Sequence, residues 1–381
     1  MPRRRGNAGP TAHPSSTPEQ KPLKFSKPPK KRHNWIKIIG RSLLVVLLLA
    51  ILSVGYVGWK FMSNEVKVFG WGGIWSLLDP GPLKSQGGRV NLLLAGDSVG
   101  RTDSGGGQQL TDSIMIVSID TQNHTAFLLS VPRDLYVNIP GFGYSKINAT
   151  AEDGASNYGN NSNYDANGMG LLEQVVSQDF GIPIDYYALI DYAAFQGAVN
   201  AVGGITVDIQ STDPRGLYDA SATSPTDPTP LVDLSNGEHE LNGQEALNLA
   251  RARGDAAGSY GFGASDFVRT QNQREMLIAI KTKAASAGVL SNPFKLGDLF
   301  DSFGDNVETD MSLGNAKKLY DITKQINNSA IKSEGLNNAN GQDLTTGYYT
   351  PDGEDALIPA AGIGNYSQIQ LFIGQLTDSS Q

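Results

Sequence analysis

The sequence contains no cysteine, which excludes a disulfide scaffold, thiol catalysis and zinc–thiolate sites. Its four histidines are scattered at positions 13, 33, 124 and 239, which argues against a histidine-based metal cluster. Charged residues make up only 18% of the 381 residues, whereas glycine occurs 44 times. This composition predicts long loops around a sizeable core, in two average domains or in one large domain with appendages.

Basic residues are concentrated at the N-terminus. Residues 1–41 carry a net charge of +10, and the remainder carries −18. Residues 1–34 are rich in Pro, Ser and Lys and poor in apolar side chains, which predicts a disordered basic arm. Such an arm could bind nucleic acid, but the sequence has no helix-turn-helix signature and an apolar segment follows at once. We therefore expect no nucleic-acid partner, and we expect the arm to contact anionic lipid headgroups.

The apolar segment has the length of a membrane span. Eighteen residues, Ser42–Trp59, carry no charge, and a helix needs about 20 residues to cross a bilayer. Trp35, Tyr56 and Trp59 resemble interfacial aromatic residues. A cleaved signal peptide is the alternative, but the segment is long and no clear cleavage site follows it. We predict one transmembrane helix at residues 35–62, with residues 1–34 in the cytoplasm and everything after the helix outside the cell.

Short apolar runs and helical patterns alternate after a predicted stalk at residues 63–88, which indicates an α/β domain. The predicted strands are 90–95, 114–119, 125–131, 186–190 and 205–209, and the predicted helices are 169–176, 192–202, 242–253, 266–285 and 313–327. Residues 150–168 and 211–236 are predicted to be loops. We expect a three-layer-like domain at residues 89–330, with a central mixed β-sheet flanked by helices. Residues 331–381 are expected to form a partly ordered C-terminal extension.

Two aspartates mark the ends of neighbouring predicted strands. Asp97 ends the first strand and Asp112 begins the second, and each is next to a hydroxyl side chain. Taken singly, either residue is ordinary for a turn or a cap. As a pair they suit magnesium, which binds one or two carboxylates together with substrate phosphates. We therefore predict a magnesium site at Asp97 and Asp112.

The segment Leu128–Asn148, LLSVPRDLYVNIPGFGYSKIN, delivers charged residues to the end of a third strand. A proline stops the strand because it cannot donate a ladder hydrogen bond, and Arg133 and Asp134 follow directly. Glycines then turn the chain before Lys146. A surface ion pair is the simplest interpretation of Arg133 and Asp134 alone. Their position near other polar strand ends favours a binding site.

The second half of the chain adds two polar groups. Arg251 and Arg253 lie in a last helical turn, where the helix dipole favours cations whatever their function. Asp266, Arg269 and Gln273 are spaced i, i+3 and i+7, so they share one helical face, which is either a solvated stripe or part of a site. Arg binds phosphate oxygens in bidentate fashion and Lys binds them as a point charge. Cations gathered in an otherwise acidic domain therefore indicate a pyrophosphate site.

The chain resembles the LytR-CpsA-Psr family of cell-wall ligases through six ordered motifs, VNLLLAGDS, TDSIMIVSID, LLSVPRDLYVNIPGFGYSKIN, VNAVGGITVDI, LNGQEALNLARAR and SDFVRTQNQ. The resemblance covers residues 89–285, and the short basic arm and single anchor also match. It implies a phosphotransferase that moves a glycopolymer from a polyprenyl-pyrophosphate carrier to a muramic acid hydroxyl of peptidoglycan, with formation of a phosphodiester. It also implies a membrane-anchored protein whose catalytic domain lies outside the cell.

The resemblance assigns roles to residues of this sequence. Magnesium would be held by Asp97 and Asp112, and either Asp97 or Asp266 would help to deprotonate the acceptor. The implied catalytic residues are Asp97, Arg133, Asp266 and Arg269, and the implied pyrophosphate-binding residues are Arg101, Arg133, Lys146, Arg251, Arg253, Arg269 and Gln273.

The sequence departs from the family pattern at two positions. Leu110 stands two residues before Asp112, where the family often has Arg, and Arg101 is a candidate substitute. Asn272 precedes Gln273, where the family often has Arg. Two other functions remain open, a hydrolase of polyprenyl-pyrophosphate carriers and a non-catalytic regulatory protein of the envelope. The retained aspartates and arginines argue against a non-catalytic protein, but ligase and hydrolase would use the same residues.

Overall fold

The computed structural model describes residues 79, 81–97, 110–160, 165–224, 227–263, 265–287 and 306–378. All of them belong to one unit, residues 52–381. The predicted basic arm, the predicted transmembrane helix and Arg101 lie outside the described residues. Within the described ranges, no helix combines the length and the apolar character that a membrane crossing requires.

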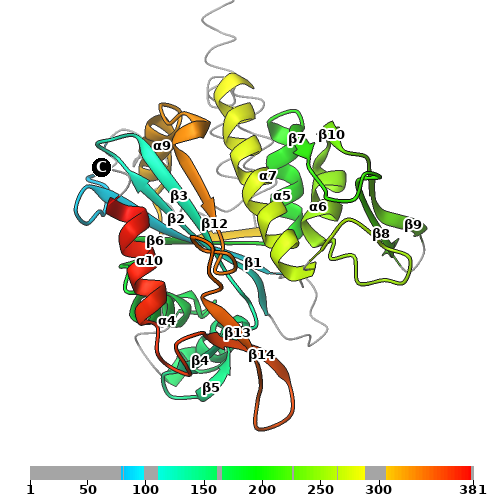
Figure 1. Cartoon of the computed structure of the whole chain (residues 1–381). Helices are drawn as coiled ribbons and strands as arrows, with labels where there is room; N and C mark the ends of the chain where they lie inside the picture. Colours follow the sequence, from blue (N-terminus) through cyan, green and yellow to red (C-terminus); the bar gives the residue numbers. More distant parts are fainter. Residues whose placement is uncertain are drawn as a thin grey trace, which may run out of the picture. The chain divides into compact units, whose positions relative to one another are not determined.

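The largest sheet in these ranges has six strands, which in spatial order are β11 (Val307–Thr309), β6 (Tyr186–Ile190), β1 (Arg89–Asp97), β2 (Thr111–Asp120), β3 (Thr125–Val131) and β12 (Ile331–Glu334) (Figure 1). Strands β1, β2 and β3 are antiparallel neighbours, and β11 is antiparallel to β6. In contrast, β6 runs parallel to β1, and β12 runs parallel to β3. The prediction of a central mixed sheet is confirmed.

One face of this sheet is covered by α4 (Met169–Phe180) and α10 (Ser367–Asp378) (Figure 1). Alternate strand residues such as Leu93 and Phe127 pack there against helix residues such as Phe180 and Phe372, and all four are buried. The alternation follows from the strand period of two, which sends successive side chains to opposite faces.

The other face packs against α7 (Ser265–Ala287) and α9 (Leu313–Thr323). Val117 and Leu128 contribute to that core from the sheet, and Leu319 contributes from α9. Helices therefore flank both faces, in the layered α/β arrangement predicted from the sequence.

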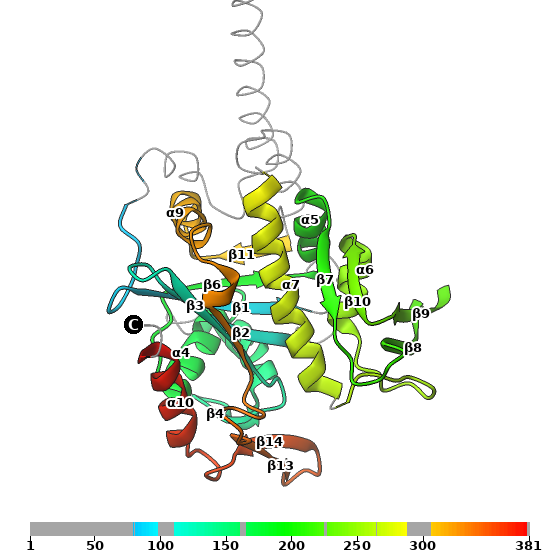
Figure 2. The ribbon, with the colours of Figure 1, turned by 45° about the horizontal axis from the view of Figure 1, so that its top comes forward.

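A further layer lies against α7 on the side away from the sheet (Figure 2). Its elements are α5 (Tyr192–Ala201), β7 (Ile205–Ile209), β10 (Gly237–Leu241) and α6 (Gly243–Arg251). Val207, Leu249 and Met276 belong to its buried core. The predicted start of α6 is confirmed by a capping box, in which the Asn242 side chain accepts from the Glu245 amide at 3.1 Å and the Glu245 carboxylate accepts from the Asn242 amide at 2.8 Å.

Two predicted loops contain regular structure instead. Residues 150–168 include the helix α3 (Thr150–Ser156) and a 3-10 turn at Tyr158–Asn160. Residues 211–236 form an antiparallel hairpin of β8 (Leu217–Ser224) and β9 (Asp227–Leu234). Register shifts interrupt this hairpin on both sides of the Ala222–Pro230 pair, so its sequence lacks the regular alternation that identifies a strand.

The predicted domain boundary at residue 330 is wrong. Strand β12 begins at Ile331 and pairs with β3 in the central sheet. The residues after it form the hairpin of β13 (Thr345–Tyr349) and β14 (Asp355–Pro359) and then α10, which buries Ile369, Phe372 and Ile373 against the sheet. The last described segment is therefore part of the domain core.

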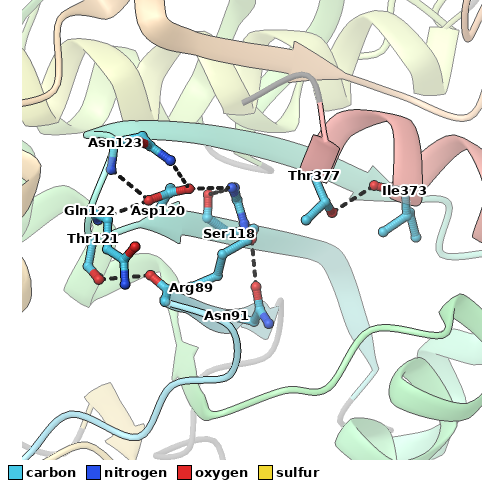
Figure 3. Close-up of polar contacts among 10 residues, drawn as sticks. Arg89, Asn91, Ser118, Asp120, Thr121, Gln122, Asn123, Ile373 and Thr377 are labelled. Atoms are coloured by element: carbon cyan, nitrogen blue, oxygen red, sulfur yellow. Dashed lines mark hydrogen bonds and ion pairs between the residues drawn. The ribbon is translucent and has the colours of Figure 1, made fainter. Parts of the chain in front are cut away.

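The beginning of β1 is fixed by a buried polar network (Figure 3). Arg89 donates from Nε to Ser118 Oγ at 3.0 Å and pairs with Asp120 at 3.3 Å, and Ser118 donates to Asn91 Oδ1 at 2.6 Å. These bonds hold β1 in register with β2. The opposite end of β1, at Asp97, is where the polar residues predicted to form the site gather.

Candidate functional site

The ends of β1 and β2 place the two predicted magnesium ligands on neighbouring strands. Asp97 is paired with Thr111, the residue before Asp112, and a register shift separates it from Gly96. Asp97 is buried, and Thr111 donates from its hydroxyl to the backbone carbonyl of Asn148 at 3.1 Å. The segment after β3 is thereby tied to the start of β2.

Arg133 lies at the centre of the site and contacts three carboxylates. Its Nη1 donates to Asp112 Oδ1 at 2.6 Å, and its Nε lies 3.5 Å from Asp134 Oδ2 and 4.0 Å from Asp266 Oδ1. Burial opposes the charge of Arg133, but the carboxylates of Asp112, Asp134 and Asp266 outweigh burial and raise the pKa of the guanidinium. Residues from β2, the end of β3 and α7 thus meet at one side chain.

Arg269 is the buried cation of the site. Its Nη2 lies 2.7 Å from Asp266 Oδ1, one helical turn away on α7, and donates to the Asp112 carbonyl at 3.2 Å. Burial lowers the pKa of Arg269, and the positive charges of Arg253 and Arg133 lower it further. Asp266 and Asp112 act in the opposite direction. The predicted helical face of Asp266 and Arg269 is therefore directed at the start of β2 and is not a solvated stripe.

The end of α6 brings two more arginines towards this cluster. The Arg251 guanidinium lies 5.2 Å from the ring centroid of Tyr192, at the start of α5. The amide of Arg253 is held at 2.9 Å by the buried carboxylate of Asp219. Burial opposes ionisation of Asp219, yet hydrogen bonds from Ser221 and from the amides of residues 253 and 254 lower its pKa. Asp219 therefore fixes the chain that carries Arg253.

Two predicted phosphate ligands have other contacts. Gln273 donates from Nε2 to the Ala250 carbonyl at 3.0 Å, which joins α7 to the last turn of α6. Lys146 lies 3.6 Å from Asp134 and 3.1 Å from Glu354. It is therefore on the rim of the Arg133 cluster, by which we mean Arg133, Asp112, Asp134, Asp266 and Arg269. In this structure Gln273 joins two helices next to the site, and Lys146 pairs with carboxylates at its edge.

Sequence reasoning missed two residues of this neighbourhood. Tyr192 lies among the charges of the cluster: burial raises its pKa, Arg251 and Arg269 oppose this, and Asp112 adds to it. The sequence contains a feature that indicates Tyr192 as a site residue: it begins a helix directly after a predicted strand, where α/β sites form. Glu354 belongs to the turn PDGED, and nothing local to that turn indicates contact with Lys146.

The cluster has the donors that an anion with several oxygens requires. The Nε groups of Arg133 and Arg269 are buried and donate no hydrogen bond to any described residue. Arg133 Nε lies within ion-pair distance of Asp134 and Asp266, but neither Nε nor Asp266 Oδ1 makes a hydrogen bond with a described residue. Because buried donors are normally hydrogen-bonded, the two Nε groups are free to donate to a further acceptor such as a phosphate oxygen.

A magnesium ion fits this donor set only together with a ligand. Among the described residues, no group of three or more His, Cys, Asp or Glu side chains is placed to hold a metal ion. Magnesium needs one or two carboxylates when substrate phosphates complete its shell. Asp97 and Asp112, on neighbouring strand ends, fit such a shared site and not an all-protein cage.

The fold and the site together define an α/β protein in which arginines and carboxylates gather at the ends of the central strands. The chain belongs to the LytR_cpsA_psr family, which matches residues 78–357. The family expected from the six sequence motifs is therefore confirmed.

Known proteins of two kinds are similar to this chain. The polyisoprenyl-teichoic acid–peptidoglycan teichoic acid transferase TagT of Bacillus subtilis (strain 168) is 30% identical over 299 residues, which are 76% of this chain and 82% of that protein. The regulatory protein MsrR of Staphylococcus aureus (strain COL) is 28% identical over 260 residues, which are 65% of this chain and 68% of that protein. A solved structure described as TagT bound to LI-WTA has a TM-score of 0.55 and 25% identity, and the match covers 78% of this chain and 94% of that one.

Proposed function

We propose that this protein is a phosphotransferase that moves a glycopolymer from a polyprenyl-pyrophosphate carrier to peptidoglycan and forms a phosphodiester. The observation that carries the proposal is the convergence of Arg133 and Arg269 on Asp112 and Asp266, from three different elements. A pyrophosphate is the anion that such a pair of guanidinium forks can grip at two linked phosphates. The transferase TagT, similar over most of its length, supports the same reaction class.

The reaction needs one bond to form and one to break. The acceptor hydroxyl oxygen attacks the phosphorus that bears the glycopolymer, and the bond from that phosphorus to the bridging oxygen breaks. The products are the phosphodiester and the polyprenyl monophosphate. Arg133 and Arg269 would bind the phosphate oxygens and stabilise the negative charge that develops on the bridging oxygen. Asp97 or Asp266 would accept the proton of the acceptor hydroxyl.

Magnesium is proposed as the cofactor, held by Asp97 and Asp112. When bound there, it would supply additional neutralisation of phosphate charge. Arg251 and Arg253 would extend the cation-rich surface towards the phosphates, and Lys146 would do so from the rim. Arg101 remains a proposed ligand on the basis of the family resemblance, and Gln273 would position α6 against α7.

The carrier's lipid tail requires an apolar site near the phosphates. A cavity of about 640 Å³ lies between α7 and β7. Its lining is mixed: Val207, Ile209, Val268, Met276 and Ala279 are apolar, whereas Asp208, Glu275 and Lys283 are charged. Val268 and Arg269 are neighbours on α7, so the same helix contributes to the cavity and to the cation cluster. We assign the tail to this cavity. Membrane attachment through residues 35–62, with the domain outside the cell, is part of the same proposal because a lipid-linked substrate stays in the bilayer.

The test is a transfer reaction with the full-length protein. A polyprenyl-pyrophosphate oligosaccharide, peptidoglycan fragments and magnesium are incubated together, and the products are weighed by mass spectrometry. We expect a phosphodiester-linked adduct from the wild type, and its loss in Arg133→Ala and in Asp97→Ala. Oligosaccharide phosphate without adduct would indicate the hydrolase, and unchanged turnover in both variants would refute the proposed site.

A further inference from the structure

Two hairpins form the rim of the Arg133 cluster. The first, β4 (Tyr136–Ile139) and β5 (Gly143–Lys146), follows Arg133 and Asp134 directly in the chain. The second is the hairpin of β13 and β14, whose Leu357 amide donates to the Asp134 carbonyl at 2.9 Å. Lys146 of the first hairpin pairs with Glu354 of the second at 3.1 Å. The rim is thus bonded directly to the residue beside Arg133.

Three tyrosines from the two hairpins gather on this rim. The ring centroids of Tyr136 and Tyr144 are 5.4 Å apart and nearly stacked, and those of Tyr136 and Tyr348 are 5.7 Å apart. Tyr144 is 48% exposed, and the other two are half-buried. We call Tyr136, Tyr144 and Tyr348 the tyrosine platform. Burial raises the pKa of Tyr136, and Tyr348, Asp352 and Tyr144 raise it further. Lys146 lies opposite Tyr136 in the hairpin, so a charged group stands beside the rings.

The chemistry of the platform matches a sugar better than a lipid or a phosphate. The C–H face of a pyranose ring packs on an aromatic ring, while its hydroxyls bond to the polar edges of the same site. Tyrosine hydroxyls with Asp352, Lys146 and Glu354 at the edge provide such partners. Carboxylates at the edge also disfavour an anionic polymer, because like charges repel.

The position of the platform favours binding of the acceptor and not of the lipid-linked donor. The cavity assigned to the lipid tail lies between α7 and β7, whereas β4, β5, β13 and β14 form a separate region of the domain in both views (Figures 1 and 2). Arg133 and Asp134 lie where the chain passes from the sheet into the first of these hairpins. A donor that places its phosphates at Arg133 and its tail in the cavity leaves the platform side for the second substrate.

We propose that the tyrosine platform binds the glycan strand of the acceptor, a neutral-backbone polymer of amino-sugar pyranose rings, and guides its hydroxyl to the phosphates at Arg133. This rests on the proposed function. It adds a recognition site for the second substrate, built partly from the segment after residue 330 that the sequence does not connect with the site. Stacking orients the sugar, and the adjacent Arg133 defines where the reacting hydroxyl must lie.

The test compares single-ring variants of the full-length protein. Binding to purified peptidoglycan glycan oligosaccharides, without lipid donor, is measured by calorimetry for Tyr144→Ala and Tyr348→Ala. Each variant should bind about five- to tenfold more weakly than the wild type, because each loses one stacking surface. Tyr144→Phe, which keeps the ring, should retain most of the affinity. The matched control is Tyr158→Ala, since Tyr158 is 51% exposed on a different element and should leave binding unchanged.

A second readout separates this proposal from the proposed function. In the transfer reaction, the platform variants should raise the KM for the acceptor and leave the KM for the lipid donor unchanged. Transfer by the wild type with glycan binding that is equal in all variants would overturn the platform while the phosphotransferase stands. Glycan binding that depends on the rings, in a protein without transfer activity, would support the platform and refute the phosphotransferase. Platform-dependent binding to anionic lipid vesicles in place of glycan would overturn the assignment.

Discussion

Arg133 and Arg269 illustrate how the proposed phosphate site can be assembled before its ligand arrives. Each guanidinium is held by carboxylates, Asp112 and Asp266, so its position is determined by the folded chain. The buried Arg269 lies near other positive charges, which lower its pKa together with burial. A bound pyrophosphate would relieve that repulsion and use the two Nε donors. Preorganised charge of this kind stabilises a transition state without the cost of reorganising the site.

Asp266 should therefore contribute to stability as well as to the site. Asp266→Asn should lower the free energy of unfolding by about 2 kcal/mol, because it removes a charged partner at 2.7 Å from a buried guanidinium. Urea denaturation of the full-length protein measures the change. The control is Asp321→Asn, whose carboxylate pairs with Lys317 and Lys324 on an exposed face of α9 and should have no measurable effect. Equal destabilisation by both variants would contradict this account of Arg269.

Sequence reasoning at the residue scale succeeded where a side chain follows a recognisable strand or helix end. Asp112, Arg133, Asp266 and Arg269 all have such positions, and the structure brings them together. It could not find the contact of Lys146 with Glu354, because that contact joins two hairpins far apart in the chain. The roles of Asp112, Arg133, Asp266 and Arg269 in catalysis remain predictions.

The elements that position the site are α7 and the C-terminal segment. Helix α7 packs against both the central sheet and β7, so it carries Asp266 and Arg269 between two cores. Buried Arg274, one turn further along α7, donates to Ser130 of β3 and Ser333 of β12 at 2.6 and 3.0 Å. The edge strand β12 therefore helps to fix the helix that presents the site.

Helix α10 should be as important to stability as the predicted elements. Phe372→Ala should lower the free energy of unfolding by about 3–5 kcal/mol, because Phe372 is buried against the sheet. Its neighbour Leu371 is 66% exposed, so Leu371→Ala should change stability by less than about 0.5 kcal/mol. Thermal and urea unfolding distinguish the two variants. If Phe372→Ala were as stable as Leu371→Ala, α10 would not be part of the core.

The missed elements share a physical reason. Strand β12, with the sequence IKSE, is too short for its alternation to stand out, and only its pairing with β3 makes it a strand. The hairpin of β8 and β9 has two register shifts and contains prolines, which local propensity assigns to loops. Elements with regular apolar runs, such as β3 and α4, were predicted because burial itself creates their pattern.

At the scale of the whole molecule, positive charge is concentrated at one site of a domain that is acidic on average. Residues 42–381 carry a net charge of −18, yet arginines from the end of β3, the end of α6 and the first turns of α7 gather around Asp112 at the start of β2. An acidic surface repels free polyanions, while a local cation cluster attracts a phosphate that reaches it. The cavity beside α7 and the tyrosine platform would then supply separate contacts for the two uncharged parts of the substrates.

The central claim, that Arg133 and Arg269 form one pyrophosphate site, can be measured by a double-variant cycle. The affinity of the full-length protein for geranyl pyrophosphate is determined by calorimetry for the wild type, Arg133→Gln, Arg269→Gln and the double variant. Each single variant should lose at least about tenfold in affinity, and the double variant should lose much less than the product of the two, with a coupling of about 1 kcal/mol or more. Losses that multiply independently, or affinity that is unchanged in either single variant, would contradict the shared site.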